Sequence, residues 1–240
     1  MQPQIMAILN VTPDSFYAGS RIQDPDRLVS AALRCLDEGA DILDIGACST
    51  RPDSLPASEE EEWSRLEPAL RALRNRMPDA RLSVDTFRPE IARRALESFG
   101  PLIVNDVSGG CEAMFNLVRG YRVPYIWTLR GDYSRLQEID RMEGIELILD
   151  PGLGFTGGVD NDYRCLRQID QLSACGRPVL VGVSRKSMLY RLLETTPEDC
   201  LAATQVLHLF ALQHGATILR VHDVREARQT VRLYGKLMEN

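Results

Sequence analysis

Long apolar runs are missing from this sequence of 240 residues. Its apolar segments have the length of β-strands, far short of the ~20 residues that span a bilayer. The first residues, Met1 to Gln4, also lack the basic flank and cleavage site of a signal peptide. We therefore expect a cytoplasmic protein that does not bind membranes.

Positive charge is also scarce. The chain has 28 lysines and arginines against 34 aspartates and glutamates, a formal net charge of −6, and its isoelectric point is near 5.2. A nucleic-acid surface needs a basic stripe to neutralise phosphates, which argues against this class of partner. We expect the partner to be a small molecule.

Cysteine pairs at redox or metal-binding spacing are absent as well. The six cysteines form no C-x-x-C motif, so buried reduced thiols are favoured over disulfides or a zinc site. No glycine-, serine- or proline-rich linker interrupts the chain, and 44% of its residues are hydrophobic, enough for one large core. We predict a single domain over residues 1–240.

What the sequence does contain is eight short apolar runs, each followed by a helix-like stretch. Such runs are typical of parallel strands buried on both faces. Eight βα units close most economically into a (β/α)₈ barrel, an α/β fold, with a doubly wound open sheet as the alternative. No glycine-rich dinucleotide-binding turn follows the first run, which favours the barrel. The runs are residues 5–9, 41–45, 81–84, 102–104, 125–127, 145–149, 179–183 and 217–219.

Several helix-like stretches begin with recognisable capping signals. Asp24 is an expected N-cap, Ser58 and Glu61 have the spacing of a capping box, and Asp223 precedes the last stretch. The fifth unit is short, because residues 134–142 allow at most two or three turns at ~3.6 residues each. We therefore predict a barrel with a shortened fifth α unit.

Two βα connections, residues 10–23 and 46–57, are unusually long. Loops of that length inside a compact domain are usually functional. Both follow strands, so they are expected at the same rim of the barrel. That rim is where barrels of this type keep their chemistry.

Polar residues follow the apolar runs at this rim. Each has a simpler structural interpretation: Asp44 could fill an interior layer, and Asp150 could start a turn before Pro151. Their joint occurrence at strand exits favours a functional site. The rim residues are Asn10, Asp44, Arg51, Asp85, Asn105, Asp150, Arg185, Lys186, Arg220 and His222.

The aspartates of this rim, together with Asn105 and Lys186, suit a flat heterocycle with a donor-rich edge. Carboxylates accept paired N–H bonds, and a lysine can donate to a ring nitrogen or a carbonyl oxygen. Burying these charges without partners would be costly, so a polar ligand is expected to complete them.

A second set of rim residues is locally cationic in an otherwise acidic chain. It comprises Arg51, Arg220, His222 and the amide of Asn10, here called the anion-binding group. Arginine and histidine around an amide suit a phosphate or diphosphate. Arg220 and His222 alternate along one strand and therefore share a face.

Seven segments in register resemble the dihydropteroate synthase family, the folate-pathway enzymes that sulfonamides target. The resemblance covers nearly the whole chain, and the segments follow the family's order. They are Asn10-Val11-Thr12-Pro13-Asp14-Ser15-Phe16, Ser49-Thr50-Arg51-Pro52, Ser83-Val84-Asp85-Thr86, Asn105-Asp106-Val107-Ser108-Gly109-Gly110, Asp150-Pro151-Gly152-Leu153-Gly154-Phe155, Ser184-Arg185-Lys186-Ser187 and Arg220-Val221-His222-Asp223.

The resemblance implies condensation of 6-hydroxymethyl-7,8-dihydropterin diphosphate with p-aminobenzoate, with release of pyrophosphate. It also implies magnesium bound with Asn10, and a homodimer formed through the outer helices. Asp85, Lys186 and Arg220 are the implied catalytic residues. The residues implied to contact the pterin, called the ring-binding group below, are Asp85, Asn105, Asp150 and Lys186, with Phe155 beside them. Those implied for the diphosphate are Arg220, His222 and Asn10, and those for the aminobenzoate pocket are Phe16, Thr50, Arg51 and Pro52.

The sequence departs from the family at several positions. Where the family has methionine-histidine-methionine after the fifth strand, this chain has Trp127-Thr128-Leu129. Ala18 stands where many members have an aspartate, and Cys48 stands where a glutamate is common. Two alternatives therefore stay open: a paralogue that binds pterin without condensing it, and a methyltetrahydrofolate-type methyltransferase. Pyrophosphate release would separate the first from a synthase. The second is disfavoured by the segments Ser184-Arg185-Lys186-Ser187 and Arg220-Val221-His222, because those methyltransferases lack the diphosphate-binding group.

Overall fold

The computed structural model describes residues 2–11, 24–48 and 57–239. Within them, eight parallel strands pair in the order β6-β5-β4-β3-β2-β1-β8-β7. The strands are β1 (Gln4–Asn10), β2 (Ile42–Gly46), β3 (Leu82–Asp85), β4 (Ile103–Asp106), β5 (Tyr125–Thr128), β6 (Leu147–Asp150), β7 (Leu180–Val181) and β8 (Ile218–Val221).

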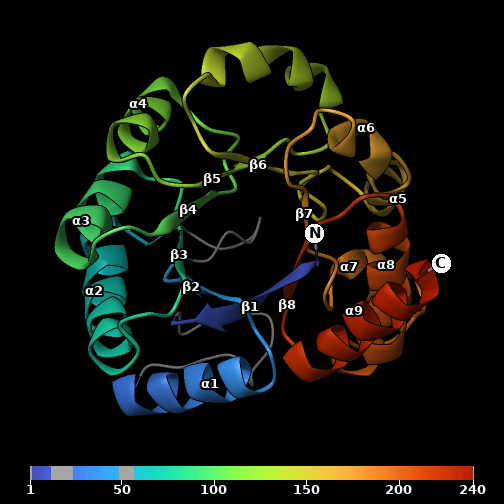
Figure 1. Ribbon diagram of the computed structural model, residues 1–240, viewed down its shortest axis with the longest axis horizontal. Helices are drawn as coiled ribbons and strands as arrows, with labels where there is room; N and C mark the ends of the chain where they lie inside the picture. Colours follow the sequence, from blue (N-terminus) through green and yellow to red (C-terminus); the bar gives the residue numbers. More distant parts are fainter. Residues whose placement is uncertain (1, 12–23, 49–56, 240) are drawn as a thin grey trace.

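The sheet closes between β6 and β7. Leu149 forms a parallel bridge with Val179, and its amide donates to the carbonyl of Pro178 at 2.9 Å. The strands therefore form a ring with helices around it, as Figure 1 shows. The predicted (β/α)₈ barrel is confirmed, and the open sheet is excluded.

The helices form the outer layer of the barrel (Figure 1). They are α1 (Pro25–Asp37), α2 (Glu59–Arg76), α3 (Pro89–Phe99), α4 (Glu112–Tyr121), α5 (Val159–Arg167), α6 (Ile169–Ser173), α7 (Ser187–Leu192), α8 (Leu201–Gln213) and α9 (Val224–Met238), with 3₁₀ segments η2 (Tyr133–Met142) and η3 (Glu198–Cys200).

Alternate strand residues divide between two apolar clusters. One fills the barrel interior, and the other lies between the strands and the helices. Because parallel strands alternate their side chains, the residues that continue the inward row toward the carboxyl ends face the rim. The interior cluster contains Met6, Ile42, Ile103, Ile126, Ile148, Leu180 and Ile218.

The three predicted helix starts are confirmed. The Asp24 carboxylate accepts from the amide of Asp26 at 3.0 Å, and Ser58 and Glu61 form a reciprocal capping box. Asp223 is the N-cap residue of α9, as predicted, although its side chain makes no capping bond to the helix. Its two carboxylate oxygens accept from Arg185 instead.

The shortened fifth unit is the 3₁₀ segment η2, ten residues long, drawn in yellow-green at the top of Figure 1. A 3₁₀ helix rises ~2.0 Å per residue against 1.5 Å for an α-helix, so a short sequence covers more of the barrel wall. Beneath it Trp127 is fully buried and donates from Nε1 to the carbonyl of Gly109 at 2.8 Å. Arg135 of η2 stacks on the Trp127 ring and donates to the same carbonyl. The short unit therefore still covers β5 and fixes the loop after β4.

Candidate functional site

The predicted rim residues that the structure describes come together at the carboxyl ends of the strands. Asp85 ends β3, Asp150 ends β6, and Asn105 is next to last in β4. Arg220 lies on β8 next to its end, and Lys186 follows β7. The barrel thus brings residues that are up to 176 positions apart in the sequence into hydrogen-bond contact.

Arg220 links two of the carboxylates. Its Nε donates to Asp44 Oδ2 at 2.7 Å, and its Nη2 donates to Asp85 Oδ2, also at 2.7 Å. Asp44 is fully buried, whereas the Asp85 side chain keeps 14% of its exposure. One guanidinium therefore bridges two carboxylates below the rim, and the pair of acids outnumbers its cation.

Asp85 has an unusual acidity because of this environment. Burial raises the pKa of its carboxyl to about 7; Arg220 opposes the shift and Asp44 adds to it. Those same two acids raise the pKa of the Arg220 guanidinium, overcoming the lowering effect of its burial. At neutral pH Asp85 is therefore near its midpoint of protonation, unlike a solvated aspartate.

Asn105 joins this network and leaves acceptors for a ligand. Its Nδ2 donates to Asp44 Oδ2 at 3.1 Å. Asn105 Oδ1, Asp44 Oδ1 and Ser83 Oγ are buried without a hydrogen-bond partner among the described residues. Buried polar atoms are almost always paired, so this inner edge of the rim suits a ligand that carries N–H donors.

Asp150 is held by two donors and lies near Lys186. Its Oδ2 accepts from Thr128 Oγ1 at 3.2 Å, and its Oδ1 accepts from the amide of Gly152 at 2.8 Å. Burial raises the pKa of Asp150, with Lys186 as the main opposing influence. Thr128 and Asp150 are register partners in β5 and β6. The hydroxyl of Thr128 therefore fixes the orientation of this carboxylate.

Lys186 reaches the same space. Its ammonium donates to the carbonyl of Leu153 and lies 5.5 Å from the centre of the Phe155 ring. Burial lowers the pKa of Lys186 to about 8, while Asp150 opposes the shift. A lysine with this pKa is mostly protonated at neutral pH and can exchange its proton readily. Lys186, Phe155 and Asp150 thus form the second side of a heterocycle site.

His222 contacts Ser184 through both its backbone and its ring. The amide of His222 donates to Ser184 Oγ at 3.2 Å, and the ring Nδ1 lies 3.0 Å from the same oxygen. Burial lowers the pKa of His222 to about 4, and Arg220 adds to this effect. The histidine is therefore neutral at neutral pH.

Arg185 has a structural role that its place among the rim residues of the sequence did not predict. Its guanidinium donates to both oxygens of Asp223, at 2.9 and 2.7 Å, and to the carbonyls of Pro197 and Glu198, each at 3.0 Å. These bonds tie the loop after β7 to the start of α9. Arg185 therefore supports Lys186 rather than presenting its charge to a ligand.

Asn10 and Asp85 flank a gap that a glycine keeps open. A β-carbon placed on Gly46 would lie 3.3 Å from Asn10 Oδ1 and 3.5 Å from Asp85 Oδ2. Two oxygen atoms therefore converge beside Gly46. No cluster of three or more histidine, cysteine, aspartate or glutamate side chains suited to a metal occurs among the described residues.

The predicted residues of the two long loops cannot be placed. Phe16, Thr50, Arg51 and Pro52 lie outside the described residues, as does Ala18. Cys48, which is described, is partly buried, and burial raises the pKa of its thiol, with Glu62 as the next contribution.

The segment after β5 divides between the two faces of the strand. Trp127 and Leu129 belong to the outer apolar cluster, whereas Thr128 lies in the inward row and bonds Asp150. The departure at this strand exit therefore puts one small polar side chain, Thr128, at the rim. The sequence placed Thr128 at a strand exit but assigned it no role, because its partner lies on the next strand.

A buried acidic network lies behind the rim and has no signal in the sequence. Glu62 is the last of four consecutive glutamates at the start of α2, a pattern typical of a solvated first turn. Its side chain is fully buried, accepts from Thr86 Oγ1 at 2.6 Å and pairs with Arg88. This pairing anchors α2 to the end of β3, next to Asp85.

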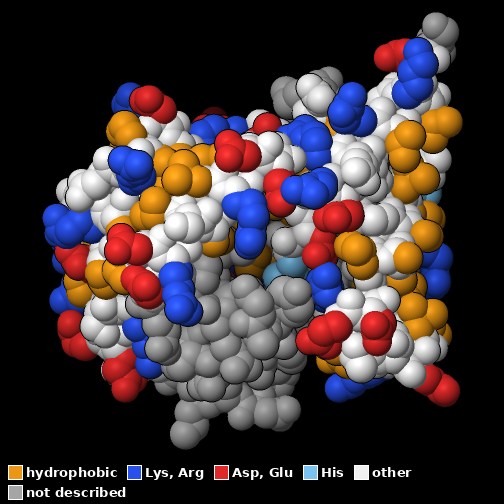
Figure 2. All heavy atoms as spheres, turned by 90° about the horizontal axis from the view of Figure 1, so that it is seen from below, with side chains coloured by type: hydrophobic (Ala, Val, Ile, Leu, Met, Phe, Trp, Pro, Cys, Tyr) orange, Lys and Arg blue, Asp and Glu red, His pale blue; other side chains and the backbone are white. Residues whose placement is uncertain are grey.

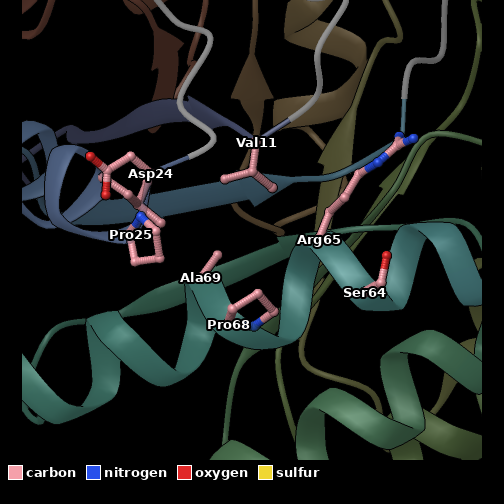
Figure 3. Close-up of a pocket in the computed structure, with 8 residues that line it drawn as sticks. Val11, Asp24, Pro25, Ser64, Arg65, Pro68 and Ala69 are labelled. Carbon is pink, nitrogen blue, oxygen red and sulfur yellow. The ribbon is translucent and has the colours of Figure 1, made fainter.

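A cavity of about 210 Å³ lies away from these groups, between α1 and α2 (Figure 3). Apolar side chains such as Leu28 and Ala69 line it together with Asp24 and Arg65. Asp24 caps α1, and Arg65 donates to the carbonyl of Ala47. The convergent charges are at the rim and not in this cavity.

Comparison with known proteins places the chain among pterin-binding enzymes. The family model described as "Pterin binding enzyme" matches residues 6–144 and 133–222. Dihydropteroate synthase of Mycobacterium leprae is 35% identical over 97% of this chain and 92% of its own length. A folate synthesis bifunctional protein of Arabidopsis thaliana is also 35% identical, over 98% of this chain, which spans 56% of that longer protein.

The fold is also similar to that of a solved structure with the same activity in its name. A dihydropteroate synthase of Coxiella burnetii in complex with pteroic acid superposes with a TM-score of 0.89 and 32% identity. The match covers 98% of this chain and 93% of the other. The likeness therefore extends over the whole barrel, including the shortened fifth unit.

Proposed function

This chain belongs to the dihydropteroate synthase family of pterin-binding enzymes, and we propose how its barrel rim carries out that family's reaction. The enzyme is a transferase of folate biosynthesis. It condenses 6-hydroxymethyl-7,8-dihydropterin diphosphate with p-aminobenzoate to give 7,8-dihydropteroate and pyrophosphate. The observation that carries the assignment is the convergence of Asp85, Asn105, Asp150 and Lys186 around buried acceptors that have no partner within residues 2–11, 24–48 and 57–239.

The ring-binding group holds the pterin. The aminopyrimidine edge of the pterin carries several N–H donors, which match the oxygens of Asp85, Asn105 and Asp150. Lys186 donates to the acceptor side of the ring, and its position against Phe155 places an aromatic face beside the bound heterocycle. The two carboxylates also stabilise positive charge that develops on the pterin as the diphosphate departs.

The anion-binding residues Arg220, His222 and Asn10 receive the diphosphate. Arg220 presents a guanidinium that is held in place by Asp44 and Asp85, so its orientation is set before the substrate arrives. Fixed donors stabilise the leaving group without reorganising during the reaction. Asp85, Lys186 and Arg220 are therefore the residues to which we assign catalysis.

Magnesium fits the oxygen atoms beside Gly46. This ion prefers oxygen ligands and is commonly held by one or two protein groups together with substrate phosphates. Asn10 Oδ1 would be the protein ligand, and the diphosphate would supply further oxygens. When bound, the ion would neutralise charge on the leaving group.

The aminobenzoate pocket remains a prediction. Phe16, Thr50, Arg51 and Pro52 are its proposed residues, and they lie outside the described ranges. Sulfonamides resemble p-aminobenzoate in shape and charge, so we expect them to compete with it for this pocket. No helix in the described parts of the chain is long and apolar enough to cross a membrane. The cytoplasmic location likewise stays a proposal.

We expect a homodimer formed through α8 and α9. The sequence of α8 is apolar around most of its circumference, although only one face packs on the barrel. Val206 of α8 and Leu233 of α9 are each about two-thirds exposed. Figure 2 shows hydrophobic side chains gathered along this edge of the molecule. A helix that is apolar all round is normally buried, here by a second copy.

Charge placed on this face should separate the dimer. We expect Val206→Glu with Leu233→Glu to sediment as a monomer, whereas the unaltered chain sediments as a dimer. Leu33→Glu on α1 is the control, because Leu33 is also exposed but lies on another side of the barrel. A monomeric parent chain, or a dimeric double variant, would contradict the proposal.

Removal of the Thr128 hydroxyl should weaken pterin binding. Valine has the same shape but cannot donate to Asp150, and a hydrogen bond to a charged group contributes about 1.5–3 kcal/mol. We expect Thr128→Val to raise the dissociation constant for 6-hydroxymethyl-7,8-dihydropterin at least about tenfold in calorimetry. Thr128→Ser keeps the donor and should bind nearly as well as the parent. Equal affinity in all three chains would remove Thr128 from the site.

The function itself is tested by product formation. Mixing the chain with the pterin diphosphate, p-aminobenzoate and magnesium should release pyrophosphate and dihydropteroate in equal amounts. Pterin binding without pyrophosphate release would instead favour the paralogue that binds but does not condense. The structure of the fifth unit favours synthase activity over the paralogue, because η2 covers β5 and all four residues of that strand are buried.

A further inference from the structure

We propose that Ser184 is a positioning residue that fixes the tautomer of His222, so that the ring presents an Nε2–H donor to the diphosphate. The inference rests on the proposed function for the identity of the anion, but the tautomer itself is a property of the free protein. Ser184 lies between Val183, at the end of the seventh strand run, and Arg185, which is tied to Asp223. Its hydroxyl is therefore carried on a well-anchored loop.

The hydrogen bonds around Ser184 Oγ decide the direction of the ring contact. The oxygen accepts from the amide of His222 at 3.2 Å and lies 3.0 Å from His222 Nδ1. If Nδ1 carried the proton, Oγ would accept twice, and its own hydroxyl proton would need another acceptor. Ser184 is 4% exposed and makes no other hydrogen bond within the described part of the chain. Donation from Oγ to Nδ1 satisfies every group, since a buried donor is rarely left unpaired.

The charges around the ring exclude the doubly protonated form. Lys186 and Arg185 approach from the loop after β7, and Arg220 lies on β8 beside the ring. Asp223 is the acid that opposes these cations, and both of its oxygens are paired with Arg185. The imidazole is therefore neutral, and with Nδ1 accepting from Ser184 its single proton is on Nε2.

This arrangement suits recognition of a diphosphate. A neutral ring that carried its proton on Nδ1 would turn a lone pair on Nε2 toward the anion and repel it. The Nε2–H tautomer instead adds a donor without adding another buried positive charge beside Arg220. Because the tautomer is fixed before the substrate binds, no free energy is needed to change it during the reaction.

Nitrogen NMR of the imidazole rings tests the tautomer directly. The chain has three histidines, so a His222→Gln variant identifies the His222 signals by their loss. We expect the free protein at neutral pH to show protonated Nε2 and unprotonated Nδ1 for His222. Ser184→Ala should produce a mixture of tautomers, and Ser184→Thr should retain the parent pattern. Protonated Nδ1 in the parent, or an unchanged pattern in Ser184→Ala, would overturn the proposal whether or not the enzyme is active.

Ligand binding tests the consequence. We expect Ser184→Ala to weaken binding of the pterin diphosphate roughly tenfold and to leave 6-hydroxymethyl-7,8-dihydropterin, which lacks the anion, unchanged. Thr204→Val is the matched control, because Thr204 also bonds this loop, through the amide of Arg185, but does not touch His222. Equal losses for both ligands would indicate a general loosening of the loop and contradict the assigned role.

Discussion

Replacing Arg220 with alanine is expected to destabilise the folded protein by about 3–5 kcal/mol, the usual cost of leaving a buried charge without its partner. Arg220 is the shared partner of Asp44 and Asp85, and Asp44 is fully buried. Its loss leaves two neighbouring carboxylates facing each other. Denaturant unfolding at neutral pH would measure the effect.

The destabilisation should depend on pH in a defined direction. The folded-state pKa of Asp85 is already raised to about 7, and loss of Arg220 would raise it further. A carboxyl whose folded pKa is raised favours the folded state at low pH and loses that contribution as the pH rises through the folded pKa. The deficit of Arg220→Ala should therefore be largest above neutral pH and smaller near pH 5. A deficit that grew in acid would contradict the bridging role.

Two further variants separate this effect from a general loss of charge. Arg225→Ala removes an exposed arginine paired with Glu38 and should change stability little, because surface ion pairs contribute little. Adding Asp85→Asn to Arg220→Ala removes one of the two facing charges and should recover part of the lost stability. If the double variant recovered no stability, repulsion between the two carboxylates could not be the cause of the destabilisation.

Asp85→Asn alone is expected to weaken pterin binding at least about a hundredfold, or roughly 2.7 kcal/mol. The amide keeps the shape of the carboxylate but turns an N–H₂ group toward the donor edge of the ring, so two donors face each other. Stability should not fall in parallel, because the raised pKa shows that burial of this charge is already unfavourable. Calorimetry with 6-hydroxymethyl-7,8-dihydropterin and denaturant unfolding would measure the two quantities.

Asp106→Asn is the matched control for this prediction. Asp106 lies at the end of the neighbouring strand β4, but its carboxylate accepts from Tyr125 and from the amide of Ser108. The same chemical change is thus made in a buried aspartate on the other face of the sheet. Asp106→Asn should leave pterin affinity close to that of the parent. If Asp85→Asn also bound normally, the ring-binding group would have to be reassigned.

The contacts of Arg220 also determine which ligands should bind more weakly when this side chain is removed. A side chain that served only the diphosphate would spare the bare pterin when removed. Because Arg220 holds Asp85 in place, its loss should impair both kinds of ligand. The hydrogen bonds of His222 to Ser184 do not involve the ring-binding residues, and so Ser184 and His222 are the better probes of the diphosphate alone.

Local order was predictable because it depends on neighbours in the chain. Apolar runs of strand length, the caps at Asp24 and Ser58, and the short stretch before residue 145 each express a local preference, and the structure contains all of them. Asp223 also precedes its helix as predicted, but its side chain does not cap α9. Its carboxylate had a stronger partner in Arg185, 38 positions away, which no local pattern reveals.

The barrel was predictable from the sequence alone, as was the clustering of polar residues at the carboxyl ends of its strands, because side-chain type and strand period are both properties of the chain. The tertiary structure decided which of those residues bond one another. Closure of the sheet placed Arg220 between Asp44 and Asp85, set Thr128 opposite Asp150, and withdrew Arg185 from the rim. Partnership between charges depends on distance in space and on burial, and both are fixed only when β8 pairs with β1 and the ring is complete.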